Sequence, residues 1–210
     1  MRGTRWWPVL MLGALLASCA SSPPTQFYTL EPVQPCQPSG AGSAGANACG
    51  PVSIRERTLH ASTGPIQVAP VHIPAVLERQ EIVTERGPNE LILSNRHRWG
   101  APLAEMTRRT LTQDLLQRMQ ANEVVLPEQP APPNTREIVV DILRLQYDAA
   151  GRVLLQGSWS VLPSGSDTPS LMRNFSLAGQ AGATSYAEQV QAMSRLLGQL
   201  ADDIAGAVAQ

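Results

Sequence analysis

The 210-residue chain contains no lysine, so its 16 basic residues are all arginines, and only 4% of its residues are aromatic. Sixteen basic against 17 acidic residues leave a formal net charge of −1. Because nucleic-acid-binding proteins usually carry a basic face or stripe, this balance argues against nucleic acid as a partner. The absence of an apolar run of roughly 18 residues argues against a membrane-spanning helix. A single domain remains, and its 43% of hydrophobic residues is sufficient for a core.

Residues 1–18 have the pattern of a bacterial export signal. Arg2 and Arg5 precede an apolar stretch, residues 6–17, that is too short to span a bilayer. The stretch ends in Leu16-Ala17-Ser18-Cys19, which resembles the lipobox of bacterial lipoproteins. The resemblance implies cleavage after Ser18, a diacylglyceryl group on the Cys19 sulfur and a further acyl chain on its amine. The alternative is a soluble export signal beside a chance cysteine.

The predicted lipid anchor places the protein at a membrane. Three acyl chains hold a protein durably, whereas one chain binds only marginally. Ala20 stands where an aspartate would favour retention in the inner membrane, so for a Gram-negative host we expect the periplasmic face of the outer membrane. Residues 19–25 would form a short lipidated tether, and we expect no cofactor beyond the covalent lipid on Cys19.

Two further cysteines, Cys36 and Cys49, remain once Cys19 is acylated. In an oxidising periplasm we expect them to form a disulfide, and two free thiols are the alternative. Twelve residues separate them and no other ligand lies nearby, which excludes a CxxC redox motif or a zinc site.

Hydrophobic periodicity divides the rest of the chain into strands and two helices. Residues 31–64 are rich in Pro, Gly and Ala and are predicted to be a flexible insert. The second helix follows a capping box, Ser185-Tyr186-Ala187-Glu188. Period-two segments predict strands at 26–30, 66–73, 81–85, 90–94, 124–126, 137–147, 152–162 and 171–178, and amphipathic periodicity predicts helices at 102–119 and 186–208.

This order of elements predicts an α+β fold. Two amphipathic helices and a set of strands, several joined as hairpins, are most simply arranged as a two-layer sandwich. We therefore expect a mostly antiparallel sheet with both helices on one face, formed by residues 26–210 as a single domain.

The sequence carries no recognisable catalytic pattern. His60, His72 and His97 lack the spacing of metal ligands, and no serine lies in a nucleophile elbow. The pair Asp202-Asp203 is best explained as part of a solvated helix face. We therefore predict a protein that is not an enzyme and has no metal site.

The segment of residues 95–103 joins the predicted hairpin to the first helix and sets three cations beside an indole. Because Trp and Arg supply much of the binding energy in protein interfaces, the segment is a candidate recognition patch. The alternative is a loop in which Trp99 fills the core. The partner-interface candidates are His97, Arg98, Trp99, Pro102 and Leu103.

A set of short motifs carries a family resemblance. They are Val68-Ala69-Pro70-Val71-His72-Ile73-Pro74, Leu77-Glu78-Arg79, Ile82-Val83-Thr84 and His97-Arg98-Trp99 with Pro102-Leu103. Together they resemble the ABC-type transport auxiliary lipoproteins, and within them the paraquat-inducible protein C (PqiC) type.

The resemblance implies a non-catalytic role in lipid transport and membrane integrity. Such lipoproteins serve envelope systems with an inner-membrane transporter subunit and a periplasmic MCE-domain protein that forms a hydrophobic conduit. We expect this chain to dock to the conduit protein at the outer membrane; whether it forms a homo-oligomer stays open. A module that itself carries an acyl chain is the alternative, and a lipoprotein hydrolase is a weaker one.

Overall fold

The computed structural model describes residues 24–35, 64–87, 89–120, 122–148, 151–181 and 185–209. Within these residues the chain forms one eight-stranded sheet, two α-helices and a short 3₁₀ helix at Ala75–Leu77. The strands are β1 (Gln26–Tyr28), β2 (Ile66–Val68), β3 (Glu81–Gly87), β4 (Glu90–Trp99), β5 (Val124–Val125), β6 (Arg136–Tyr147), β7 (Arg152–Leu162) and β8 (Leu171–Gln180); the helices are α1 (Leu103–Arg118) and α2 (Tyr186–Val208).

Strand β6 organises the sheet. One of its edges pairs with β7, which in turn pairs with β8, both antiparallel and along nearly their whole length. Its other edge is shared by two short parallel neighbours, β2 at one end and β3 at the other. Beyond β2 lies β5, and beyond β3 lie β4 and then β1. The predicted α+β class is confirmed, with an open sheet in which long antiparallel and short parallel pairings are mixed.

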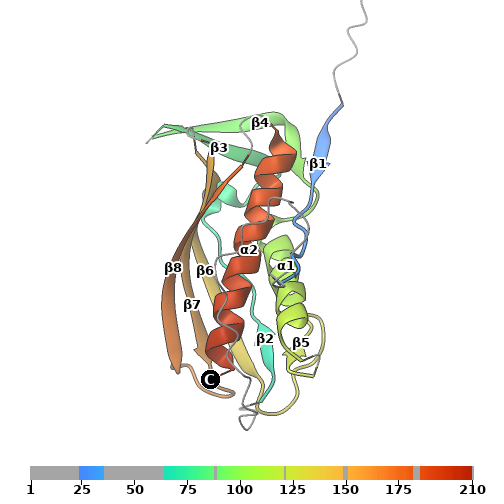
Figure 1. Ribbon diagram of the computed structural model, residues 1–210, viewed down its shortest axis with the longest axis vertical. Helices are drawn as coiled ribbons and strands as arrows, with labels where there is room; N and C mark the ends of the chain where they lie inside the picture. Colours follow the sequence, from blue (N-terminus) through green and yellow to red (C-terminus); the bar gives the residue numbers. More distant parts are fainter. Residues whose placement is uncertain are drawn as a thin grey trace, which may run out of the picture.

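Both helices lie on one side of the sheet and pack against each other (Figure 1). Helix α2 covers β7 and β8, and α1 covers β2 and β5. Trp159, which is 1% exposed, is the largest side chain fully buried in the core. Helix α2 begins where the capping box predicted, but the Ser185 side chain makes no capping bond; the Ser185 carbonyl instead accepts the Gln189 N–H at 3.1 Å.

The inward face of β6 differs from the predicted one. One unbroken alternation from Glu137 to Tyr147 predicts Val139, Leu143, Leu145 and Tyr147 on one side of the strand. In the structure Ile138, Val140 and Ile142 are buried together with Leu145 and Tyr147, and Leu143 is 74% exposed. A register shift between Ile142 and Arg144 changes the phase of the strand. A single extra residue exchanges the two faces of a strand. Even-numbered residues therefore face the core before the bulge and odd-numbered residues face it afterwards, so no unbroken alternation describes the whole strand.

The predicted flexible insert is described only at its ends. Residues 31–35 run along the two helices and hydrogen-bond to both, as set out below, and Gly64 leads into β2. The rest of the insert, with Cys36 and Cys49, lies outside the described residues, as do Cys19 and the predicted signal. Among the described residues, no helix is long and apolar enough to cross a membrane.

Candidate functional site

The candidate recognition segment is partly strand. Residues 95–99, predicted as a loop, complete β4. Of these, 97–99 pair in parallel with β1, Gln26 opposite His97 and Tyr28 opposite Trp99. The chain reaches this register through an irregular stretch in which the buried Ser94 accepts the N–H groups of Arg96 (3.4 Å) and His97 (3.0 Å) on its Oγ. The hydroxyl thus replaces ladder bonds that the irregular stretch removes from the strand.

Trp99 and Leu103 belong to the hydrophobic core. They are 4% and 2% exposed, so neither side chain can reach a partner directly. The Trp99 N–H donates to the Gln80 carbonyl at 2.7 Å, which fixes the end of β4 against the start of β3. Trp99 therefore fills the core, which is the alternative given for this segment in the sequence analysis. Only the residues around Trp99 are exposed.

Three aromatic rings meet where β1, β4 and the start of α2 come together. The His97 ring stacks on Tyr186 with centroids 3.9 Å apart, and its Nδ1 lies 2.9 Å from the Tyr28 hydroxyl. Tyr28 O–H donates to Gln26 Oε1 at 2.7 Å, so the hydroxyl is free to accept from His97 Nδ1–H. Burial, followed by the neighbouring Tyr186, raises the pKa of Tyr28. The cluster makes His97 a connector between three elements.

The surface of the segment is formed by Arg96, Arg98 and Pro102. Arg98 lies 3.7 Å from Glu81 and is half-buried. Arg96 is exposed and forms no ion pair with any other described residue. Pro102 is exposed and directly precedes α1, whereas the predicted helix began at Pro102 itself. The side chains available to a partner are therefore a pair of arginines beside a proline, without the indole.

A second site holds the chain that leaves β1. We call residues 29–35 the N-terminal strap. Thr110 Oγ1 donates to the Leu30 carbonyl (3.4 Å), and the Glu31 N–H donates to Ser194 Oγ (3.1 Å). The Val33 N–H donates to Asp114 Oδ1 (2.7 Å). The strap is thus bonded to both helices at successive residues.

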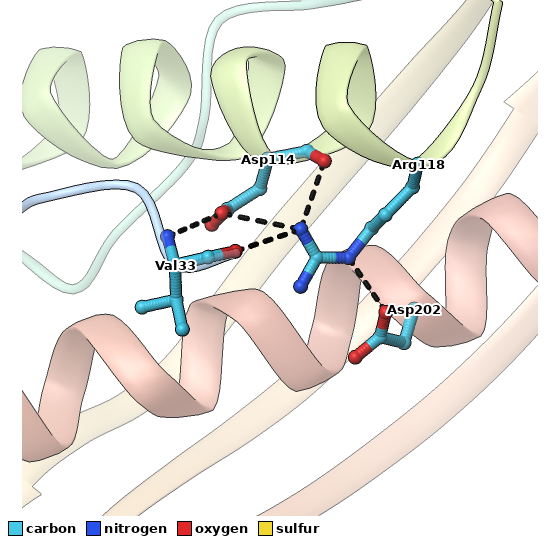
Figure 2. Close-up of polar contacts among 4 residues, drawn as sticks. All are labelled: Val33, Asp114, Arg118 and Asp202. Atoms are coloured by element: carbon cyan, nitrogen blue, oxygen red, sulfur yellow. Dashed lines mark hydrogen bonds and ion pairs between the residues drawn. The ribbon is translucent and has the colours of Figure 1, made fainter. Parts of the chain in front are cut away.

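Arg118 closes this site, as Figure 2 shows. Its Nη1 donates to the carbonyl of Val33 (3.0 Å) and to Asp114 at both the carbonyl (2.9 Å) and Oδ1 (3.3 Å). Its Nε donates to Asp202 Oδ1 on α2 at 2.6 Å. The Asp114 side chain is fully buried and that of Arg118 is 5% exposed, so the pair is shielded from water.

The strap sits between two matched stripes of helical residues. Thr110, Asp114 and Arg118 recur every four residues on α1, and Ser194, Gly198 and Asp202 do so on α2. Residues four apart lie on the same helix face, so each set forms one line toward the strap. A Cβ on Gly198 would lie 3.2 Å from the Val33 Cβ, which is why a glycine fits there. These two spacings are visible in the sequence, and only Asp202 was singled out there.

Burial raises the pKa of Asp114 to about 6. The Val33 N–H and the Arg118 guanidinium act in the opposite direction, and nearby Asp202 adds to the increase. Desolvation therefore outweighs the favourable contacts of the charged form.

The remaining candidates show no converging chemistry. His72 pairs with Asp141 at 2.9 Å on the surface, and Asp203 accepts from Trp159 Nε1 at 2.9 Å. His60 lies outside the described residues. In the described part of the chain, no three His, Cys, Asp or Glu side chains come close enough together to bind a metal.

Solved structures share this fold. An uncharacterised protein is 21% identical, with a TM-score of 0.63 over 71% of this chain and 95% of its own. A Xanthomonas campestris protein described under the family DUF330 is 16% identical, with a TM-score of 0.58 over 70% of this chain and 84% of its own. At these identities the likeness defines the fold class only. No curated protein matches the chain in sequence.

A family model that covers most of the chain establishes the family. The model of the ABC-type transport auxiliary lipoprotein component matches residues 28–205, which include both sites described above. The chain belongs to this family, and the resemblance drawn from its motifs is confirmed.

Proposed function

We propose that this chain is a PqiC-type lipoprotein, held at the periplasmic face of the outer membrane by acylated Cys19. In this proposal it is the non-catalytic auxiliary subunit of an ABC-type system that moves lipid, and it docks to an MCE-domain conduit protein. The family description as an auxiliary lipoprotein component supports the coarser part of the role.

The observation that carries the proposal is the short path from Cys19 to the sheet. Strand β1 begins at Gln26, seven residues after Cys19. Seven extended residues span at most about 25 Å. An acylated Cys19 would therefore keep the β1 end of the domain close to the membrane surface.

The strap connects the anchored end of the chain firmly to the rest of the domain. Directly after β1 the chain is bonded to α1 and α2 through Leu30, Glu31 and Val33. A pull on the anchor is thus distributed over the sheet and both helices. This arrangement suits an adaptor that holds a partner against a membrane.

The anchor is tested by replacing Cys19 with serine. The parent protein is expected in the outer-membrane fraction and its intact mass is expected to include the acyl groups, whereas Cys19→Ser is released from the membrane and lacks that mass. A Cys19→Ser protein that fractionates with the membrane like the parent would contradict the proposal.

Docking is tested separately on Arg96 and Arg98. Arg96→Glu and Arg98→Glu are expected to weaken co-purification with the MCE-domain protein, while thermal unfolding stays close to that of the parent. Arg109→Glu, at an exposed position on α1, serves as the matched control. Equal co-purification of all three variants would remove this patch as the contact. Trp99→Ala is unsuitable for the test, because Trp99 is a core residue.

A further inference from the structure

Strand β8 leaves a long sheet edge open. All ten of its residues pair with β7 in one unbroken register, from Arg152 opposite Gln180 to Val161 opposite Leu171. No other described segment pairs with β8, which is the outermost strand of the sheet in Figure 1. The other outer strands, β1 and β5, are only three and two residues long.

The direction of the open backbone groups follows from one hydrogen bond. The Ala181 N–H donates to the Gly151 carbonyl at 3.2 Å, in continuation of the β7–β8 register. Because an antiparallel ladder alternates sides, odd-numbered residues of β8 bond to β7. The even-numbered residues point their N–H and C=O groups to the free edge: Met172, Asn174, Ser176, Ala178 and Gln180.

This edge has none of the usual protections against pairing. Edge strands are commonly guarded by lysine, proline, a bulge or a short length, and β8 has none of these. Its one charged residue, Arg173, is exposed on the helix side of the sheet and bonded to α2: Nη1 lies 3.1 Å from Asp203 Oδ1, and the guanidinium lies 5.8 Å from the centre of the Trp159 ring. A regular, uncharged edge of this length is suited to accept another strand.

We propose that β8 pairs in antiparallel fashion with β8 of a second copy, about a two-fold axis at Ser176. In this register the outward-facing residues meet one another, Asn174 opposite Ala178 and Met172 opposite Gln180. On the helix side Phe175 lies opposite Leu177, and both are half-buried in the single chain. Arg173 lies opposite Gly179, so the two arginines do not face each other.

In this register the strand matches itself in hydrogen bonding, and no two like charges lie opposite each other. Burial of the Phe175–Leu177 pairs on both sides of the axis supplies the apolar contact that a bare backbone pairing lacks. A C2 axis makes the contact isologous and closed, which excludes open-ended growth of the sheet. The proposal is independent of lipid acylation and of the transport role.

The register is tested by cysteine cross-linking in the full-length lipoprotein, in envelopes, with Cys36 and Cys49 replaced by serine. Ser176→Cys is expected to give a disulfide-linked dimer on mild oxidation, because the two Cβ atoms meet at the axis. Met172→Cys alone is expected to give none, yet to cross-link to Gln180→Cys when the two variants are co-expressed. Ser158→Cys on β7 is the matched off-edge control.

The backbone contact is tested by a proline pair. In the Ser176→Cys background, Ala178→Pro removes an outward N–H and is expected to lower the cross-linked fraction about tenfold, whereas Ala178→Ser keeps it. Dimer at Ser158→Cys equal to that at Ser176→Cys, or no dimer at Ser176→Cys, would overturn the proposal. A cross-link from Ser176→Cys to a different protein would show that another partner occupies the edge, and would overturn it as well.

Discussion

The two edge strands β1 and β8 differ in length and in what the chain does beside them. At the β1 end the edge strand has three residues, and the chain then turns away and is bonded to both helices as the strap. At the β8 end ten residues in regular register pair with β7 and with no other described strand. One end is closed by the chain itself, and at the other a row of backbone groups has no partner strand among the described residues.

The two ends of the sheet also differ in how their charged residues are placed. The closed end places a buried ion pair, Asp114–Arg118, where it fixes one conformation of the strap. At the open end the single arginine, Arg173, is bonded to Asp203 of α2 and lies over the Trp159 ring. Rigidity is thus concentrated beside the expected anchor, and the capacity for pairing lies at the other side of the sheet.

The largest effect is expected for Trp99→Ala, which removes a buried indole from the closed end. Loss of a buried aromatic side chain typically costs about 3–5 kcal/mol of unfolding free energy. Chemical denaturation of the parent and the variant measures the loss. Arg96→Ala, three residues away and exposed, is the control and is expected to change stability by less than about 0.5 kcal/mol. Similar losses for both would show that Trp99 is not a core residue.

A comparable loss is expected for Arg118→Leu. The substitution leaves Asp114 buried without its cation and the Val33 carbonyl without its donor, and breaking a buried pair costs about 3–5 kcal/mol. The double variant Asp114→Leu/Arg118→Leu removes both charges and is expected to be more stable than Arg118→Leu alone. A double variant as unstable as the sum of the two single variants would mean that the pair does not act as a unit.

A pH dependence of stability is expected from Asp114. The pKa of this carboxyl is 3.8 in an unfolded chain and about 6 in the fold, so the folded protein holds the proton more tightly. The associated stabilisation is full below pH 3.8 and is lost as the pH rises through about 6. The shift corresponds to about 3 kcal/mol at most.

Denaturation of the parent and of Asp114→Asn between pH 4 and pH 7.5 checks this dependence. The parent is expected to lose stability relative to the variant as the pH rises. Parallel stability curves would contradict a raised pKa, and a parent that gains stability over the same range would reverse its sign.

Local patterns in the sequence were sufficient for much of this architecture. The helices at 102–119 and 186–208 and the β6–β7–β8 meander were located within a few residues, because periodicity and turn residues are short-range signals. Alternation within 152–162 also predicts one face made of Val153, Leu155, Trp159 and Val161, and all four are buried in β7. The family followed from motifs spread along the chain.

Long-range pairing could not be read in the same way. The parallel contacts of β1 with β4 and of β2 with β6 join segments far apart in sequence, and no local pattern specifies them. The bulge after Ile142 hid the inward face of β6. The burial of Asp114 was not predicted, since it depends on contact with Val33, which lies in the segment predicted to be a flexible insert.

The smallest effect is expected for a proline substitution at the open edge of β8. Proline substitutions at two neighbouring residues compare an N–H that points to the free edge with one that bonds to β7. The Ala178 N–H points to the free edge, so Ala178→Pro is expected to lower the stability of the single chain by less than about 1 kcal/mol. The Leu177 N–H lies in the β7–β8 ladder, so Leu177→Pro is expected to cost about 3 kcal/mol or more. Denaturation at a protein concentration low enough to give single chains compares them. Equal losses would mean that the N–H of Ala178 is already bonded within the chain, and that β8 is no more open than β1.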